Sequence, residues 1–402
     1  MMRSKYSLVL LLLLSIIGVV LLSTTASLAD HHQQPSKPGP SLNLANDHAV
    51  KAGYWYYQSG FPVASISPTL FNHLFAAFAY VNDTTYEVTF PPGYEGIFQN
   101  FTKAVHCSQN PYIKTFLSIG GEASNPSIFA SMTSSSSSRE AFINSSIDVA
   151  RTNFYFGLSL NWQYPYTSDE MTNLGLLLTE WRAALEEEAN RTGYDRLLLT
   201  ADVFYSSYFW PSLEYPIQEI VDSLDWINVM AYDIHTPISS PNLTEPPAPF
   251  NNPLISRFSI EYGVGAWISS GVPRNFIVLG LPFYGRSWIL VNENNHEILS
   301  PARGPVPGLD PISYSKIVTI KIPPAVAKYD PAYVTNYLYN GSTWIGYDDT
   351  HTISIKIGHA KLMGLHGYFA WHVDDDTADW ALSTAAFHAW DADDHEFLLG
   401  SA

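Results

Sequence analysis

The sequence predicts an α/β fold, specifically a (β/α)8 barrel, and three observations carry this prediction. The chain has 402 residues, which suits one large domain of eight-stranded barrel size with an insertion. From Val50 onward, short apolar runs alternate with amphipathic stretches, as they do in repeated β-α units. An interval of roughly eighty residues before the last run is far longer than a single β-α connection needs. The expected strands are residues 50–56, 73–81, 112–120, 157–164, 197–205, 225–232, 275–284 and 365–372.

The clearest predicted helix follows the fourth strand. Thr167 and Glu170 have the spacing of a capping box at its start. An apolar stripe behind them indicates ordinary packing against the barrel, and it consists of Leu174, Leu177, Leu178, Trp181 and Leu185. The serine run 134–138 is expected to form a loop that leads into another helix beginning near Arg139.

The composition describes a folded, acidic chain. Charged residues make up 14% and aromatic residues another 14%, which fits a large core and an aromatic-lined cleft. The net charge of -17 argues against nucleic acid as a partner, because a phosphate backbone is itself negative. A neutral polysaccharide is neither favoured nor disfavoured by this charge.

The first residues have the pattern of a secretory signal peptide. Arg3 and Lys5 precede an apolar run, residues 8–22, and small residues follow up to Ala29. This run is short for crossing a bilayer, so a signal peptide over residues 1–29 is favoured over a retained membrane anchor. We therefore expect a secreted protein, extracellular or vacuolar, whose only membrane contact is through the cleaved signal.

The remaining chain divides into three expected parts. Residues 30–49 are polar and proline-bearing and indicate a flexible lead. Residues 50–393 are expected to form the barrel with its insertion, and residues 394–402 a C-terminal tail.

Two further features bear on export. Six sequons for N-glycosylation agree with passage through the secretory pathway, at Asn82, Asn100, Asn144, Asn190, Asn242 and Asn340. Cys107 is the only cysteine, so the chain forms no intramolecular disulfide. We expect Cys107 to be a buried small residue, in preference to a reactive thiol or an intermolecular bridge.

The fourth strand carries the most informative pattern. Leu158, Leu160 and Trp162 alternate with polar residues, which is the period of a strand with two different faces. On a barrel strand the polar row points inward and toward the carboxyl end, where such folds keep their chemistry. The alternative is that these polar side chains fill the barrel interior with satisfied hydrogen bonds.

This segment, from Phe156 to Gln163, resembles the Asp-Gly-x-Asp-x-Asp-x-Glu strand of family 18 glycoside hydrolases, and of plant class V chitinases in particular. Phe156, Ser159, Asn161 and Gln163 stand at the three Asp positions and the Glu position. The resemblance extends over most of the mature chain through ordered segments at residues 51–55, 75–79, 117–121, 230–233, 280–285, 344–349 and 367–373.

The resemblance also explains the long interval before the last strand. It implies a small α+β insertion domain between strands 7 and 8, over residues 289–347, that raises one wall of the substrate groove. The interval contains β-branched and Tyr-rich pieces such as residues 317–320 and 344–347, broken by Pro and Gly. Trp288 and Trp344 are further candidates for extending the groove.

The resemblance implies a substrate-assisted hydrolysis in which the N-acetyl oxygen attacks and one acid protonates the leaving oxygen. That acid belongs at Gln163, but a carboxamide has no proton to give near neutral pH. Losing this role alone removes about 10²- to 10⁴-fold of rate. Asn161 and Ser159 supply only dipoles where an anion would stabilise the positively charged intermediate. Phe156 supplies no charge and is expected to push into the pocket.

Sugar binding depends on other residues that match family positions around the groove. Trp371 is expected to form the apolar floor under the sugar, because aromatic faces pack on sugar rings. Asp233 is the carboxylate expected to remain in the cleft, and Arg286 either bonds sugar hydroxyls or pairs with a barrel carboxylate. The expected glycan-binding residues are Tyr54, Phe78, Gln163, Met230, Tyr232, Asp233, Tyr284, Arg286 and Trp371.

The leading hypothesis is thus a secreted, catalytically inactive chitinase-like protein that binds N-acetylglucosamine-containing or related glycans, such as chitin oligosaccharides, in a degenerate cleft. One alternative is a weakly active chitinase. Another is a barrel that binds a protein partner, as an inhibitor or a scaffold, with the cleft as a relic. No cofactor and no metal are implied, because no Cys, His or Asp cluster has ligand spacing.

Overall fold

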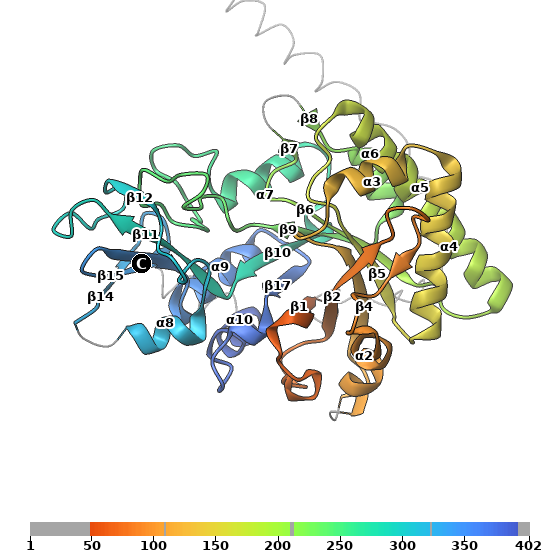
Figure 1. Ribbon diagram of the computed structural model, residues 1–402, viewed down its shortest axis with the longest axis horizontal. Helices are drawn as coiled ribbons and strands as arrows, with labels where there is room; N and C mark the ends of the chain where they lie inside the picture. Colours follow the sequence, from red (N-terminus) through yellow and green to blue (C-terminus); the bar gives the residue numbers. More distant parts are fainter. Residues whose placement is uncertain (1–48, 108–109, 210–212, 322–323, 393–402) are drawn as a thin grey trace, which may run out of the picture. The chain divides into compact units, whose positions relative to one another are not determined.

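Eight parallel strands close on themselves in the computed structural model, which describes residues 49–107, 110–209, 213–321 and 324–392. The first strand pairs both with the second and with the last, so the sheet has no free edge between them. Figure 1 shows the strands surrounded by helices. The barrel strands are β1 (Val50–Tyr56), β2 (His73–Val81), β4 (Lys114–Gly120), β5 (Gly157–Asn161), β6 (Leu198–Phe204), β9 (Trp226–Met230), β10 (Ile277–Pro282) and β17 (Gly367–Trp371). Each overlaps one predicted strand, so the (β/α)8 barrel is confirmed.

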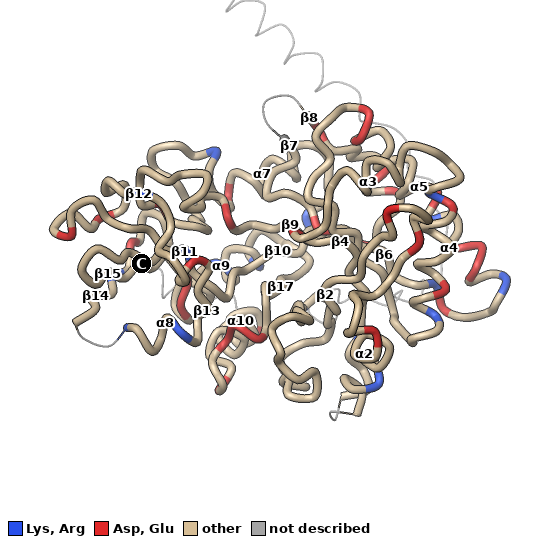
Figure 2. Tube along the Cα trace, viewed as in Figure 1, with Lys and Arg blue, Asp and Glu red and all other residues tan. Residues whose placement is uncertain are grey.

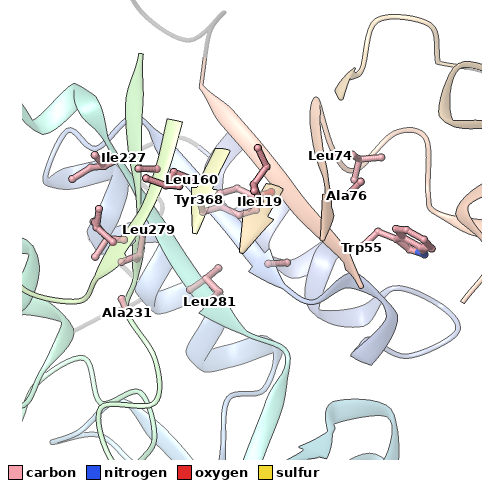
Figure 3. Close-up of a cluster of buried hydrophobic side chains, with 14 of the residues drawn as sticks. Trp55, Leu74, Ala76, Ile119, Leu160, Ile227, Ala231, Leu279, Leu281 and Tyr368 are labelled. Carbon is pink, nitrogen blue, oxygen red and sulfur yellow. The ribbon is translucent and has the colours of Figure 1, made fainter. Parts of the chain in front are cut away.

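Alternation along the strands separates two apolar cores. Side chains on the outer face pack under the helices, and Figure 3 shows part of this cluster, including Leu74, Leu160 and Leu279. Side chains on the inner face fill the barrel, where Phe75, Phe116 and other rings form a second cluster. The side chains of Leu160 and Asn161 therefore lie on opposite faces of the sheet, as the alternating sequence pattern predicts.

The helices outside the barrel are α2 (Glu95–Cys107), α3 (Pro126–Thr133), α4 (Ser136–Thr152), α5 (Ser168–Thr192), α6 (Ile217–Ser223), α7 (Ile260–Ser269), α9 (Thr350–Leu362) and α10 (Ala381–Asp391). Short strands β3 (Val88–Thr89), β7 (Tyr208–Phe209) and β8 (Leu213–Glu214) lie in the connections, as do short 3-10 turns at Tyr57–Ser59, Val63–Ser65, Arg274–Phe276 and Val373–Asp375.

The start of α5 confirms half of the predicted capping box. The Thr167 hydroxyl accepts from the amide of Glu170 at 3.1 Å. The Glu170 carboxylate accepts instead from the amide of Tyr166, one residue before the cap. The expected serine loop is partly wrong, because α4 begins at Ser136 and Ser135 caps it with its hydroxyl. Serine is a favoured cap residue, which explains how a serine run starts a helix.

The insertion between β10 and β17 is an antiparallel sheet with one helix. Its elements are β11 (Tyr284–Leu290), β12 (Ala302–Pro305), β13 (Ile312–Ser313), α8 (Tyr314–Ile320), β14 (Val326–Asp330), β15 (Thr335–Asn340) and β16 (Thr343–Tyr347). The sheet order is β12-β11-β16-β15-β14, and β13 pairs with β11. The sheet begins at Tyr284, before the predicted start at residue 289. The β-branched residues 317–320 lie in helix α8, where Ile317 packs inward.

Trp288 and Trp344 correct one expectation. Both side chains are 0% exposed, and their ring centroids lie 5.5 Å apart. They form the core of the insertion sheet and do not line a sugar-binding surface. The sequence pattern could not predict this, because alternation along a strand indicates a buried face but not whether protein or a ligand covers it.

Cys107 is exposed at the end of α2, so the expectation of a buried cysteine is wrong. Acidic and basic residues are spread over the outer helices and loops (Figure 2). The asparagines of the sequons are exposed, apart from the partly buried Asn82. The predicted signal peptide over residues 1–29 and tail over 394–402 lie outside the described residues, as does all of the lead except Ala49. Among the described residues, none forms a helix long and apolar enough to span a membrane.

Candidate functional site

The polar face of β5 points into the barrel. Ser159 and Asn161 are 0% and 3% exposed, and they hydrogen-bond to other inward-facing residues. Gln163 lies two residues beyond the strand and is partly exposed. The three polar residues therefore form a row that rises from the barrel interior to its carboxyl-terminal end. This arrangement matches the predicted row.

A carboxylate that the sequence analysis missed lies beneath this row. Asp202 belongs to β6, the neighbour of β5, and is 5% exposed. Asn161 Nδ2 donates to Asp202 Oδ2 at 2.7 Å, and Ser159 Oγ donates to Oδ1 at 3.3 Å. Ser118 of β4 also donates to Oδ2, at 3.4 Å. The sequence does contain a signal for this residue, because Asp202 is the single acidic residue in the otherwise apolar or neutral predicted strand 197–205. The family motif, however, covers β5 alone.

Residues from two further strands complete the surroundings of Asp202. The hydroxyl of Tyr54 on β1 donates to Asp202 Oδ1. Asn228 Nδ2 on β9 donates to the same oxygen at 2.9 Å, and its own Oδ1 accepts from Trp226 Nε1 at 3.0 Å. The carboxylate thus accepts from five side chains on four strands. Its lone pairs are engaged by the protein, as a buried charge requires.

Burial dominates the acidity of this group. Removal from water raises the pKa of Asp202 to about 6, although the bonds from Tyr54, Asn228, Asn161 and Ser159 work in the opposite direction. The pKa of the Tyr54 phenol is raised well above its ordinary value, first by burial and then by the charge of Asp202. Tyr54 therefore stays a neutral donor.

Gln163 is joined to this network through one neighbour. Its Nε2 donates to Asn161 Oδ1 at 2.8 Å and lies 3.6 Å from the sulfur of Met230. Met230 is the last residue of β9, so the contact fixes the amide against a second strand. Among the described residues, no side chain or backbone amide donates to the Oε1 atom of Gln163.

The aromatic residues expected under a sugar come together at the same end of the barrel. The rings of Phe78 and Trp371 stack with centroids 5.4 Å apart, and Tyr54 meets Trp371 edge-on at 5.5 Å. Trp371 is partly exposed, whereas Tyr54 and Phe78 are buried beneath it. The peptide bonds after Ala77, Gln163 and Trp371 are cis. Trp371 therefore offers the accessible aromatic surface that the sequence analysis expected.

The segments that follow β9 and β10 add a second group. Tyr232 and Tyr284 lie edge-on with centroids 6.2 Å apart. Arg286 holds Asp233 with two bonds, Nε to Oδ1 at 2.7 Å and a terminal nitrogen to Oδ2 at 2.6 Å. The other terminal nitrogen lies 3.4 Å from Asp310. Of the two predicted roles for Arg286, the structure shows the ion pair.

Burial lowers the pKa of the Arg286 guanidinium, but hydrogen bonding to Asp233 and the charge of that carboxylate outweigh it, so the net pKa is raised. The charge on Arg286 is permanent in any case. Asp233 therefore faces a fixed cation and remains a partner of Arg286. Among the described residues, no group of three His, Cys, Asp or Glu could hold a metal ion.

Phe156 is not part of this site, and the expectation that it pushes into the pocket is wrong. It precedes β5, at the amino-terminal end of the barrel, and is 42% exposed. Its ring lies 5.7 Å from that of His106, and both line a pocket of about 720 Å³ with Tyr194. The motif spacing predicted that Phe156 belongs to the polar row. Residues 156 and 163 nevertheless flank β5 on opposite sides, so they lie at opposite ends of the barrel.

A closed parallel barrel with a polar row on its fourth strand and an antiparallel insertion before its last strand is the architecture that the resemblance to glycoside hydrolases implies. The chain matches the sequence profile of the Glycosyl hydrolases family 18 over residues 50–376, and it belongs to that family. It is 44% identical over 345 residues to a class V chitinase of Arabidopsis thaliana, covering 85% of this chain and 90% of the relative.

Two solved structures are similar throughout. A class V chitinase from Nicotiana tobaccum, a mutant in which a glutamate is replaced by glutamine, was solved with NAG4. It is 42% identical, with a TM-score of 0.83, and covers 86% of this chain and 99% of its own. The chitinase-like agglutinin RobpsCRA from Robinia pseudoacacia is 44% identical, with a TM-score of 0.80, and covers 85% and 100%.

Proposed function

We propose that this chain is a secreted, non-hydrolytic member of family 18 that binds N-acetylglucosamine-containing glycans at the carboxyl-terminal end of its barrel. The single observation that carries the proposal is the amide of Gln163 at the carboxyl-terminal end of the polar row, at the motif position where the resemblance places the proton donor of hydrolysis. An amide gives up no proton in the physiological range. The sugar linkage would therefore stay intact.

Asp202 and Asp233 do not substitute for the missing acid. Asp202 is 5% exposed and lies beneath Asn161, so neither oxygen reaches a ligand. Both oxygens of Asp233 accept hydrogen bonds from Arg286, so neither is free to meet a leaving oxygen. An acid must be within hydrogen-bond reach of the leaving oxygen and must carry a proton. Both carboxylates fail the first condition, Asp202 through its burial and Asp233 through its pairing with Arg286.

Retained binding is supported by the aromatic group around Trp371 and by the relatives. The tobacco enzyme with glutamine in place of a glutamate was crystallised with NAG4, so such an exchange does not by itself abolish sugar binding in that protein. The Robinia relative is described as an agglutinin. Both similarities favour a glycan ligand for this chain, for instance a chitin oligosaccharide.

The proposal includes export through the secretory pathway, to the cell exterior or the vacuole. The basic and apolar pattern of residues 1–29 supports it, and exposed sequon asparagines such as Asn144 and Asn190 are available to a glycan. Expression in plant cells should give a mature chain that begins after Ala29. Its mass should fall on treatment with a peptide N-glycosidase, whereas an unchanged mass would contradict glycosylation.

The decisive experiment measures hydrolysis and binding on one sample of purified protein. Chitohexaose should remain uncleaved, while chitin retains the protein and Trp371→Ala loses most of that retention. Tyr112→Ala is the matched control, since Tyr112 is 87% exposed at the amino-terminal end of the barrel and should not affect retention. Ordinary chitinase turnover would refute the proposal in favour of an enzyme. Absence of any glycan binding would refute it in favour of a protein-binding barrel.

A further inference from the structure

The hydrogen bonds that connect Asp202, Asn161 and Gln163 all run in one direction. Asn161 donates from Nδ2 to Asp202 and accepts at Oδ1 from Gln163 Nε2. An ionised carboxylate only accepts, so the Nδ2 end of Asn161 has to face it. The Oδ1 atom of Asn161 then faces Gln163 and accepts a hydrogen bond from its Nε2. The charge at the bottom of the row thereby decides the orientation of both amides.

Gln163 keeps little donor capacity for a ligand in this orientation. One hydrogen of Nε2 is directed to Asn161 Oδ1 at 2.8 Å, and the sulfur of Met230 lies 3.6 Å from the same nitrogen. Sulfur is a weak acceptor, but its position occupies the second side of the amide. The atom that remains for the glycan is the carbonyl oxygen Oε1, which is an acceptor.

We propose that Asp202 is a positioning residue that orients Asn161 and Gln163, so that Gln163 offers the glycan a carbonyl oxygen and selects ligands that place a hydroxyl or N–H group there. This inference rests on the proposed function and specifies the ligand chemistry of the same site. Asp202 itself touches no ligand, because it is buried beneath Asn161.

The selected ligand differs from the one that a hydrolase holds at this place. A general acid presents a donor to the bridging oxygen of a glycosidic bond, and that oxygen only accepts. Two acceptors placed face to face make no hydrogen bond. A free anomeric hydroxyl can donate to Oε1, so the site favours the reducing end of a chitin oligosaccharide over an internal linkage. Chitotetraose should therefore bind more tightly than its methyl β-glycoside, which lacks that hydroxyl.

Protonation of Asp202 reverses the direction of the bonds. A neutral carboxyl group gains an O–H that donates to Asn161 Oδ1, and the Nδ2 end of Asn161 then turns to Gln163. Gln163 must accept with Oε1 and leaves Nε2 for the ligand. The pKa of Asp202, raised by burial to about 6, brings this change into an accessible pH range.

The groups that face Asp202 do not compete for this titration. The phenols of Tyr54 on β1 and Tyr232 after β9 are the titratable groups around it, and burial raises the pKa of both. The remaining neighbours are neutral side chains on β4, β5 and β9, namely Ser118, Ser159, Asn161 and Asn228.

The test is calorimetric titration of chitotetraose and of its methyl β-glycoside from about pH 7 to about pH 5, across the pKa of Asp202. The wild-type preference for chitotetraose over the glycoside should fall about fivefold, the effect of one hydrogen bond, because Gln163 then presents Nε2, which donates to the glycoside oxygen as well as to a hydroxyl. Asp202→Asn should give a flat profile, because it does not titrate. Asn161→Ala should also be flat, because it disconnects Gln163 while Asp202 keeps its other donors. The control Asp225→Asn removes a carboxylate at the amino-terminal end of β9 and should follow the wild type.

A flat wild-type profile overturns the proposal, as does a pH response that survives in Asp202→Asn or Asn161→Ala. Failure of the proposed function is distinguished by a measurement without ligand. The side-chain amide signal of Gln163, identified by its loss in Gln163→Glu, should shift with pH in the wild type and stay constant in Asp202→Asn. If chitotetraose does not bind but this shift is present, glycan binding is refuted and the orienting role of Asp202 stands. If the signal does not shift, the orienting role is refuted as well.

Discussion

The guanidinium of Arg286 holds both carboxylate oxygens of Asp233, at 2.7 and 2.6 Å. The two residues follow different barrel strands, so this ion pair joins the connection after β9 to the insertion sheet that begins with β11. Planar two-point pairing of this kind is specific to arginine. It fixes a carboxylate that stands partly exposed beside the proposed glycan.

Removing Arg286 should therefore destabilise the protein and disturb the site. Arg286→Ala leaves Asp233 and the buried Asp310 without their cation, and we expect a loss of roughly 1–3 kcal/mol in the free energy of unfolding. Urea denaturation measures this loss. Arg286→Lys should recover only part of it, because lysine lacks the two-point geometry. Equal stability of the alanine variant and the wild type would contradict the role assigned to the pair.

Hydrolysis should not appear when carboxylates are placed at the three positions of the polar row alone. In Ser159→Asp/Asn161→Asp/Gln163→Glu, the two aspartates would crowd against Asp202, whose oxygens lie 2.7 Å from Asn161 Nδ2 and 3.3 Å from Ser159 Oγ. Adjacent carboxylates cannot all ionise. We expect this triple variant to release no product from chitohexaose.

Adding Asp202→Ala to the triple variant relieves the crowding, and this fourfold variant should cleave chitohexaose at a measurable rate. Restoring an acid is worth about 10²- to 10⁴-fold in rate. Product analysis after equal incubation compares the two variants, with circular dichroism as the check on folding. A triple variant at least as active as the fourfold one would show that Asp202 does not conflict with the hydrolytic arrangement.

Asp202 should also leave a signature in the pH dependence of stability. Its pKa rises from 3.8 to about 6 on folding, so the folded state holds the proton more tightly than the unfolded state does. The stability that this group contributes is fully present below about pH 4 and is lost as the pH rises through 6. The difference amounts to about 3 kcal/mol. Urea unfolding at several pH values should show this decline in the wild type relative to Asp202→Asn; parallel curves would contradict it.

Phe156 supplies a test of which motif positions matter for binding. Because it lies at the opposite end of the barrel, Phe156→Asp should leave the affinity for chitotetraose unchanged within about twofold. Gln163→Leu, which removes the accepting oxygen, should weaken binding about fivefold or more. Titration calorimetry compares the two. A strong loss of affinity in Phe156→Asp, in a protein with unchanged thermal unfolding, would place the sugar elsewhere.

Period and spacing made most of the fold predictable. Apolar runs such as residues 73–81 and 277–282 are buried on both faces, which is a strong signal for a parallel strand. The insertion was predicted less well, because its β-branched residues 317–320 lie in a helix that is set by tertiary packing. Local propensity cannot report such packing.

The candidate site shows the same limit. Each residue of the row Ser159, Asn161 and Gln163 was predicted from one strand, since neighbours along a strand share a face. Asp202 was missed because its hydrogen-bond partners lie on other strands. Local spacing along the sequence does not predict which strands pair. The pattern also placed Phe156 with the row, because it gives position along the motif but not distance along the barrel axis.

Closure of the barrel also has a consequence for biosynthesis. Tyr54 on the first barrel strand meets Trp371 on the last one, and β17 must dock between β1 and β10 for that contact to exist. Such a pairing of distant segments forms late, because a long loop has to be closed first. A ribosome-bound fragment that ends before β17 would lack Trp371, on which the proposed glycan packs, so capture of freshly translated chains on chitin would report that synthesis and folding are complete.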